Sequence, residues 1–202
     1  MLIQVIYSTD DAERGSVEDL EGLAKDACDE CLEILREPEK SQAQPAMKVL
    51  CSFMATTRTC TDPYCAERAC IDPSFTAVVA RFTLSKAVPH LVKLFLNPDE
   101  IANRAPTLKL LSDIIIAARD SMSKDPEVLL ASEDVPLSPF KDEVLGVLTV
   151  GLTSASSASP ALVGLRGMAT TRGLLTEEEL GFVVHKINEL LQSEESENAD
   201  IR

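Results

Sequence analysis

The chain has 202 residues, of which 45% are hydrophobic and only 4% aromatic, and its formal net charge is −14. This charge argues against direct binding of nucleic acid or of an anionic membrane surface, because clustered lysine and arginine hold both and the sequence has no basic stripe. The shortage of aromatic residues disfavours a β-sandwich, so we predict an all-α protein. The start lacks a secretory signal and the longest apolar run is too short to span a bilayer, which predicts a cytoplasmic and nuclear location.

Residues 17–56 predict a first helical hairpin. Its first helix covers about 17–36 and stops before Pro38, and its second covers about 43–56. In both, apolar residues recur at the three- and four-residue spacing of one helix face. The predicted faces consist of Leu20, Leu23, Ala24, Ala27 and Cys31 in the first helix and of Ala43, Met47, Leu50, Cys51 and Met54 in the second.

Residues 74–121 predict a second hairpin. We expect its first helix to end at Leu96 and to be bent or broken at Pro89, which removes a backbone donor. Asn97 is placed to cap the second helix, with Pro98 in the first helical position. The predicted buried faces are Val88, Leu91, Val92 and Phe95, followed by Leu108, Leu111, Ile115 and Ala118.

A third hairpin is predicted over residues 139–172, with helices at about 139–152 and 160–172. The stretch 153–159, rich in serine and alanine, is expected to join them as a loop. The predicted buried faces are Phe140, Val144, Val147, Leu148 and Gly151 in the first helix and Leu162, Leu165 and Ala169 in the second.

The last predicted helix covers residues 176–192. Thr176 and Glu179 have the spacing of a capping box, in which each side chain bonds to the backbone N–H of the other residue. The acidic residues that follow, 193–202, are expected to form a solvated tail.

Three and a half hairpins of this kind predict an α-solenoid, in which each helix pair hides its apolar faces against its neighbours. Pro89 and Pro139 stand near the front of the first helix in successive hairpins and are 50 positions apart. This spacing is slightly longer than the roughly 40–47 residues of HEAT repeats. We therefore predict that residues 1–202 form a single HEAT-like array, and the lack of a polar capping unit predicts that it belongs to a longer one.

The cysteines raise the alternative of a small metal-binding module. Cys28 and Cys31 are three residues apart, and three more cysteines lie in residues 57–73, which we otherwise predict to be a surface insertion. Structural zinc sites usually take pairs of close cysteines from loops. Because the first pair lies on a helix whose apolar face needs both side chains, we favour core thiols and predict no metal and no cofactor. The cysteines of the insertion are Cys60, Cys65 and Cys70.

No set of residues predicts catalysis. His90 and His185 are 95 positions apart in the sequence, and each has apolar neighbours. The sequence has no nucleophile elbow, phosphate-binding glycine loop or zinc-protease motif. The carboxylates at 177–179 suit the first turn of a helix, where they offset the macrodipole. We therefore predict a protein without enzymatic activity and name no catalytic residue.

The second half of the chain contains, in this order, Ser138-Pro-Phe-Lys-Asp-Glu-Val-Leu, Pro160-Ala-Leu-Val-Gly-Leu-Arg-Gly-Met-Ala and Arg172-Gly-Leu-Leu-Thr-Glu-Glu-Glu-Leu-Gly-Phe-Val-Val. These segments resemble the fungal Mms-nineteen family, a HEAT-repeat adaptor of cytosolic iron–sulfur protein assembly that is also described in DNA repair and transcription. The similarity extends to Asp19-Leu-Glu-Gly-Leu-Ala and Ala87-Val-Pro-His-Leu, whereas residues 57–73 depart from the family. Family members are several times longer, so the resemblance implies an internal part of the scaffold. It also implies protein partners, namely the other subunits of the targeting complex and the apoproteins that receive clusters.

A partner-binding surface is predicted on the second helices of the hairpins, which carry Arg104, Lys109 and Arg166. For Arg104 we favour a structural role, in which the side chain pairs with a carboxylate or carbonyl of an adjoining repeat. A different HEAT-type scaffold, such as a nuclear transport receptor or a phosphatase scaffold, is the main alternative to cluster delivery.

Overall fold

The computed structural model describes residues 17–55, 73–122 and 135–199, and every regular element in these ranges is a helix. The all-α prediction is thereby confirmed for the described part of the chain. Within it, no helix is both long enough and apolar enough to cross a bilayer. The α-helices are α2 (Val17–Ile34), α3 (Ala43–Ala55), α4 (Pro73–Leu96), α5 (Arg104–Ser121), α7 (Lys141–Gly151), α8 (Ala155–Ala169) and α9 (Glu177–Ala199); the 3-10 helices η2 (Pro98–Asn103) and η3 (Ser138–Phe140) lead into α5 and α7.

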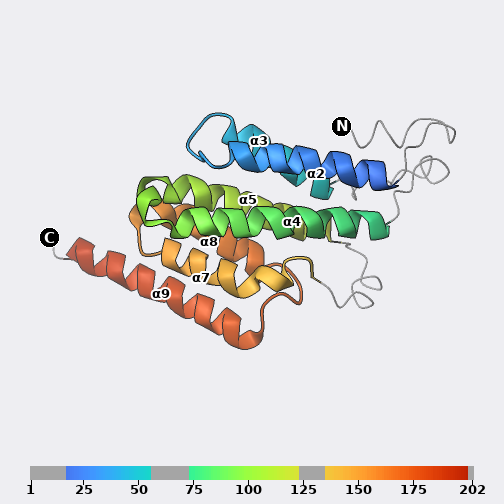
Figure 1. The fold of residues 1–202 in the computed structure, drawn as a ribbon. Helices are drawn as coiled ribbons and strands as arrows, with labels where there is room; N and C mark the ends of the chain where they lie inside the picture. The colour runs from blue at the N-terminus through green and yellow to red at the C-terminus, as the bar shows by residue number, and fades with distance from the viewer. Residues whose placement is uncertain (1–16, 56–72, 123–134, 200–202) are drawn as a thin grey trace, which may run out of the picture.

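The helices lie in two layers, which Figure 1 shows from one side. α2, α4 and α7 form the nearer layer, with α9 beyond α7, and α3, α5 and α8 form the layer behind them. Each of α2, α4 and α7 packs against the helix that follows it in the chain. In the second layer α3 packs on α5 and α5 on α8, and the α5–α8 contact is the most extensive in the described structure.

The predicted apolar faces largely form the core between these layers. Leu20, Leu23 and Ala24 lie outside the residues whose side chains are described. The prediction for α8 is wrong at Ala169, which is exposed, while Met168 is buried one position earlier. The other predicted residues are buried, apart from the half-buried Ala27, Cys51, Phe140 and Leu162.

The joint between α4 and α5 differs from the prediction in its details. α4 runs as a single helix through Pro89. Asn97 does act as a cap, with its Oδ1 accepting a hydrogen bond from Asp99 N at 3.2 Å. The helix that it caps is the 3-10 helix η2, which is kinked at Glu100, where φ is −109° and ψ is 26°. The α-helix begins only at Arg104.

The predicted loop at 153–159 is wrong, because α8 begins at Ala155 and contains Pro160 as its sixth residue. A proline this close to the helix start removes a single intrahelical hydrogen bond. A contact with α7 stabilises the first turn of α8. The buried Ser157 hydroxyl donates a hydrogen bond to the carbonyl oxygen of Gly151, the last residue of α7, at 2.6 Å. Alanine is the best helix former, so this stretch folds as helix in spite of its serines.

The predicted tail from residue 193 is also wrong for 193–199, because α9 continues to Ala199. Glutamate has a high helix propensity, and the run of glutamates extends the helix. The start of α9 is as predicted. Thr176 N donates to Glu179 Oε2 at 2.7 Å and Glu179 N donates to Thr176 Oγ1 at 3.2 Å. Glu179 also pairs with Lys141 Nζ at 2.7 Å, which ties α9 to α7.

Candidate protein-binding face

The second helices of the three hairpins share one solvent-facing surface, which we call the B face. Its residues are Gln44 and Lys48 of α3, Pro106, Lys109 and Asp113 of α5, and Ser159, Val163 and Arg166 of α8. A groove of about 720 Å³ crosses this face, and α3, α5, α8 and the turn between α2 and α3 line it. A groove of this size accommodates several side chains of a binding partner.

Where α3 meets α5, a half-buried carboxylate organises the B face. Burial raises the pKa of the Asp113 carboxyl above its ordinary value, while the charge of Lys109, the amide of Gln44 and the charge of Lys48 oppose that shift. On the backbone side, Cys51 Sγ lies 3.8 Å from the carbonyl oxygen of Asp113. These contacts join α3 to α5 and place both lysines near the seam between them.

Where α5 meets α8, a glycine allows the helices to approach closely. A Cβ atom on Gly164 would lie 2.6 Å from Leu148 Cδ2 and 2.9 Å from Ser112 Oγ, which is closer than real Cβ contacts come. The buried Ser112 hydroxyl lies 2.8 Å from the carbonyl oxygen of Leu108 and 2.7 Å from that of Pro160. Ser112 and Pro160 both line the groove, so this contact sets its floor.

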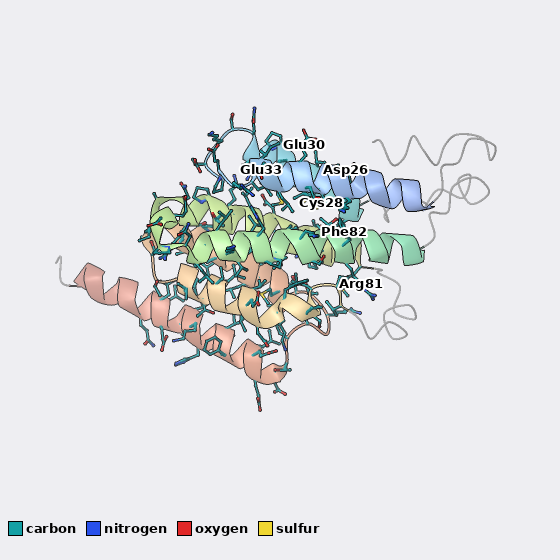
Figure 2. All side chains as sticks on the ribbon, in the orientation of Figure 1. Asp26, Cys28, Glu30, Glu33, Arg81 and Phe82 are labelled. Carbon is teal, nitrogen blue, oxygen red and sulfur yellow. The ribbon has the colours of Figure 1, made fainter. Side chains whose placement is uncertain are left out.

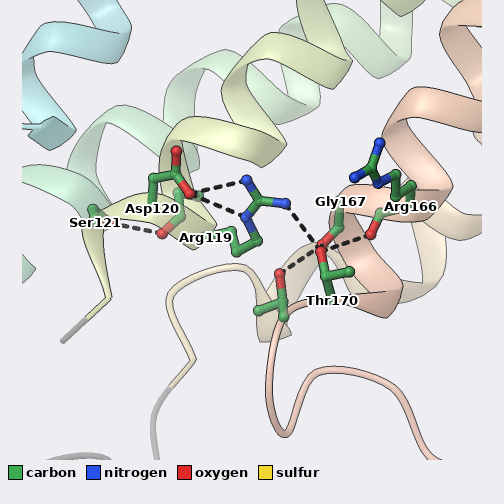
Figure 3. A network of polar contacts seen from close by, with 8 residues as sticks. Arg119, Asp120, Ser121, Arg166, Gly167 and Thr170 are labelled. Atoms are coloured by element: carbon green, nitrogen blue, oxygen red, sulfur yellow. Dashed lines mark hydrogen bonds and ion pairs between the residues drawn. The ribbon is translucent and has the colours of Figure 1, made fainter. Parts of the chain in front are cut away.

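A second polar contact joins α5 to α8 near their C-terminal ends (Figure 3). Arg119 Nε and Nη2 donate to Asp120 Oδ1 at 3.1 and 2.9 Å, and Nη1 donates to Thr170 Oγ1 at 3.0 Å. The Thr170 hydroxyl lies 2.8 Å from the carbonyl oxygen of Arg166. Asp120 therefore neutralises the charge of Arg119, and the side chain of Arg119 is committed to the helix contact.

The predicted partner-facing residues occupy two different settings. Arg104 is half-buried at the α4–α5 joint, where its Nε donates to the Phe95 carbonyl oxygen at 3.3 Å and its guanidinium carbon lies 5.2 Å from the Phe95 ring centroid. Arg104 therefore has the structural role that we favoured, because it pairs with a backbone carbonyl. That carbonyl belongs to its own hairpin and not to an adjoining repeat. Lys109 and Arg166 are exposed on the B face. Lys48, which the sequence pattern did not single out, joins them from α3.

The histidines lie on different helices. His90 lines a second groove, of about 1120 Å³, between α4 and α7. Its Nε2 is buried without a hydrogen-bond partner among the described residues, and burial, followed by the charge of Arg36, lowers its pKa. Both effects favour the neutral form of its imidazole. His185 is exposed on α9, with its Nε2 3.1 Å from Glu189 Oε1.

Cys28 and Cys31 are buried in the core, which confirms the prediction of core thiols for this pair. Figure 2 labels Cys28 between α2 and α4, while Asp26 and Glu30 on the same helix are exposed. Among the described residues, no three His, Cys, Asp or Glu side chains are placed together to hold a metal ion. The other cysteines of the alternative metal-binding module lie outside the described residues, as does nearly all of the predicted insertion; they are Cys60, Cys65 and Cys70.

We expect Cys28, Cys31 and Cys51 to react slowly with iodoacetamide in the folded chain. Burial raises the pKa of Cys28 to about 11 and that of Cys51 to about 12, and it also raises the pKa of Cys31. Because the thiolate is the nucleophile, alkylation of Cys28 at pH 8 should be slower by on the order of a hundredfold than in the urea-unfolded chain, with Cys51 slower still and Cys31 also slowed. Peptide mass spectrometry at successive times gives each rate separately. Labelling of Cys28 at the unfolded rate would show that α2 detaches from α4.

Comparison with known proteins supplies no relative from which a function could be inferred. No protein-family model, curated protein or solved structure matches the chain.

Proposed function

We propose that the chain is a segment of a HEAT-like scaffold that binds other proteins through the B face. The repeated order of helix pairs supports this proposal, since α2–α3, α4–α5 and α7–α8 each pack as a pair and the pairs pack on one another. Helix pairs stacked in this way bury a shared core and expose an extended surface for partners. The groove across α3, α5 and α8 carries the proposal, because three hairpins build it together and no single hairpin could.

We further propose that this scaffold acts in cytosolic iron–sulfur cluster delivery, without an enzymatic activity of its own. Its partners would be subunits of the targeting complex and apoproteins in the cytoplasm and nucleus, with consequences for DNA repair and transcription. This proposal rests on the resemblance to the Mms-nineteen family. The resembling segments correspond to η3 with the start of α7, to most of α8, and to the turn and first part of α9.

Co-purification from the source cells tests both proposals. The tagged chain would be compared with the double variant Lys109→Glu/Arg166→Glu and with a matched control, Lys86→Glu, which changes an exposed lysine of α4 in the other layer. We expect the unchanged chain and the control to recover targeting-complex subunits and iron–sulfur apoproteins. The B-face variant should recover about fivefold less of them in quantitative mass spectrometry, as for the loss of surface ion pairs.

Two results would contradict these proposals separately. Equal recovery of partners by the double variant would show that the B face is not the binding surface. Recovery of transport cargoes or phosphatase subunits in place of cluster-delivery proteins would assign the chain to a different HEAT-type scaffold. Circular dichroism spectra of the variants must match that of the unchanged chain, so that a loss of partners reports on the surface and not on folding.

A further inference from the structure

The charges of the chain are divided unequally between the two helix layers. α3, α5 and α8 carry five basic and two acidic residues, whereas α2, α4 and α7 carry five basic and nine acidic residues. α9 adds seven acidic residues and one lysine. A layer with net positive charge is unexpected in a chain whose net charge is −14. The basic residues of this layer are Lys48, Arg104, Lys109, Arg119 and Arg166.

Three of these basic side chains are exposed and open to a partner. Lys48, Lys109 and Arg166 form no salt bridge with any residue in the described ranges. In the other layer Lys141 is paired with Glu179, whereas the exposed Lys86 and Lys93 of α4 likewise form no salt bridge with a residue in the described ranges. The basic side chains without a salt bridge in the described ranges therefore include three that neighbouring helices present on one face. Two of them, Lys48 and Lys109, also act on the charge of Asp113.

Apolar surface lies among these charges. Val163 is 44% exposed and lines the groove together with Pro106 and Pro160. Val163 lies three residues before Arg166 and Pro106 lies three residues before Lys109, so on each helix an apolar and a basic side chain share one side. A segment lying in the groove would meet these apolar contacts beside Lys109, and also the carboxylates of Glu39 and Asp113. Lys48 and Arg166 lie on the same face outside the groove lining, where they can pair with carboxylates that extend beyond the groove.

We propose that the B face binds an acidic protein segment whose carboxylates pair with Lys48, Lys109 and Arg166 and whose apolar side chains contact Val163. This inference rests on the proposed scaffold function and specifies the chemistry of the partner. Complementary charges of this kind steer association and exclude basic partners. The apolar contacts supply affinity that salt does not screen.

Nucleic acid is the other class of anion that a basic face could bind, and three observations disfavour it. The residues that line the groove include no aromatic side chain on which a base could stack. The acidic residues Asp113 and Asp120 lie on α5, between the basic residues of α3 and α8. The net charge of −14 repels a long polyanion more strongly than it repels a short peptide with a few carboxylates.

Fluorescence anisotropy with the full chain tests this inference. The first probe is a labelled peptide that repeats Glu-Leu-Asp-Glu. A second probe has serine in place of each leucine, a third has lysine in place of each acidic residue, and a fourth is single-stranded DNA of matched charge. We expect the first probe to bind, with an affinity that falls as salt rises, the second to bind more weakly, and the third and fourth not to bind.

Variants of the B face then locate the site. Lys109→Glu and Arg166→Glu should each weaken binding of the first probe by about two- to threefold, the effect of losing one exposed ion pair. Val163→Ser should weaken binding of the leucine-containing probe and leave that of the serine-containing probe unchanged. Lys86→Glu, in the other layer, should change neither affinity.

Other outcomes would overturn the inference. If the first probe fails to bind, or binds Lys109→Glu and Arg166→Glu as tightly as the unchanged chain, the B face is not a site for acidic segments. If the DNA binds at least as well as the peptide, the face is a general polyanion site. Loss of cellular partners in the double variant, combined with failure of the acidic probe, would keep the scaffold function and reject only this partner chemistry.

Discussion

Replacing Leu165 with alanine should lower the free energy of unfolding by about 2–5 kcal/mol, the range measured for leucine-to-alanine changes in protein cores. Leu165 is 1% exposed on the inner side of α8, which packs on α5 over the largest helix contact of the described structure. Leu111, fully buried on α5, should show a loss in the same range. Urea unfolding followed by circular dichroism measures both. Because whole domains are stable by only about 5–15 kcal/mol, either loss would be a large share of the total.

The matched control is Val163→Ala, two residues before Leu165 on the same helix. Val163 is 44% exposed on the B face, so we expect its truncation to change stability by less than about 0.5 kcal/mol. A midpoint for Leu165→Ala equal to that of the control would mean that α8 presents a different face to α5. The B face would then have to be reassigned as well, since it is the opposite side of the same helix.

Periodicity predicted the helices whose apolar and polar residues are well separated. Leu108, Leu111 and Ile115 recur at helical spacing on α5, and all three are buried. The capping box of Thr176 and Glu179 likewise forms as predicted, because it depends only on four consecutive residues. Local patterns of this kind are sufficient wherever neighbours in sequence decide the structure.

The predictions were wrong where local composition favours a loop or tail and the folded chain forms a helix. The stretch 153–159 reads as a loop because serine is frequent in turns, yet the hydrogen bond from Ser157 to Gly151 supports a helix start that only the packed α7–α8 pair provides. Pro160 is then carried inside the helix. The length of α9 was underestimated for a related reason, since an acidic run resembles a solvated tail although glutamate is a good helix former.

The candidate site could be predicted only in part. Lys109 and Arg166 were identified because both lie on second helices. The basic character of the B face was missed, because Lys48, Lys109 and Arg166 are 61 and 57 positions apart in the sequence. Only the packing of α3 on α5 and of α5 on α8 brings them onto one face. A charge cluster built by contacts between distant segments has no signature in a linear pattern.

The second large effect should come from adding a single methyl group to α8 where α5 and α7 both pack on it. In Gly164→Ala the new Cβ would lie 2.6 Å from Leu148 Cδ2 and 2.9 Å from Ser112 Oγ. Leu148 is fully buried and the Ser112 hydroxyl is bonded to backbone carbonyls, so neither can move away easily. Overpacking of this kind costs about 1–3 kcal/mol. Gly167→Ala should behave similarly, because its Cβ would lie 2.9 Å from Ile115 Cγ2, on a stiff β-branched side chain.

Gly146→Ala is the matched control, because it makes the same change inside α7 where no atom lies within 4 Å of the new methyl group. Alanine favours a helix over glycine by roughly 0.5–1 kcal/mol, so the control should be slightly more stable than the unchanged chain. Since each of these variants gains that same helix propensity, the difference in unfolding free energy between Gly164→Ala and Gly146→Ala isolates the cost of packing. Equal urea midpoints for the two variants would show that α5 and α8 are farther apart than this geometry requires. The groove that lies over their contact would then lose its floor, and the argument for the B face would fail with it.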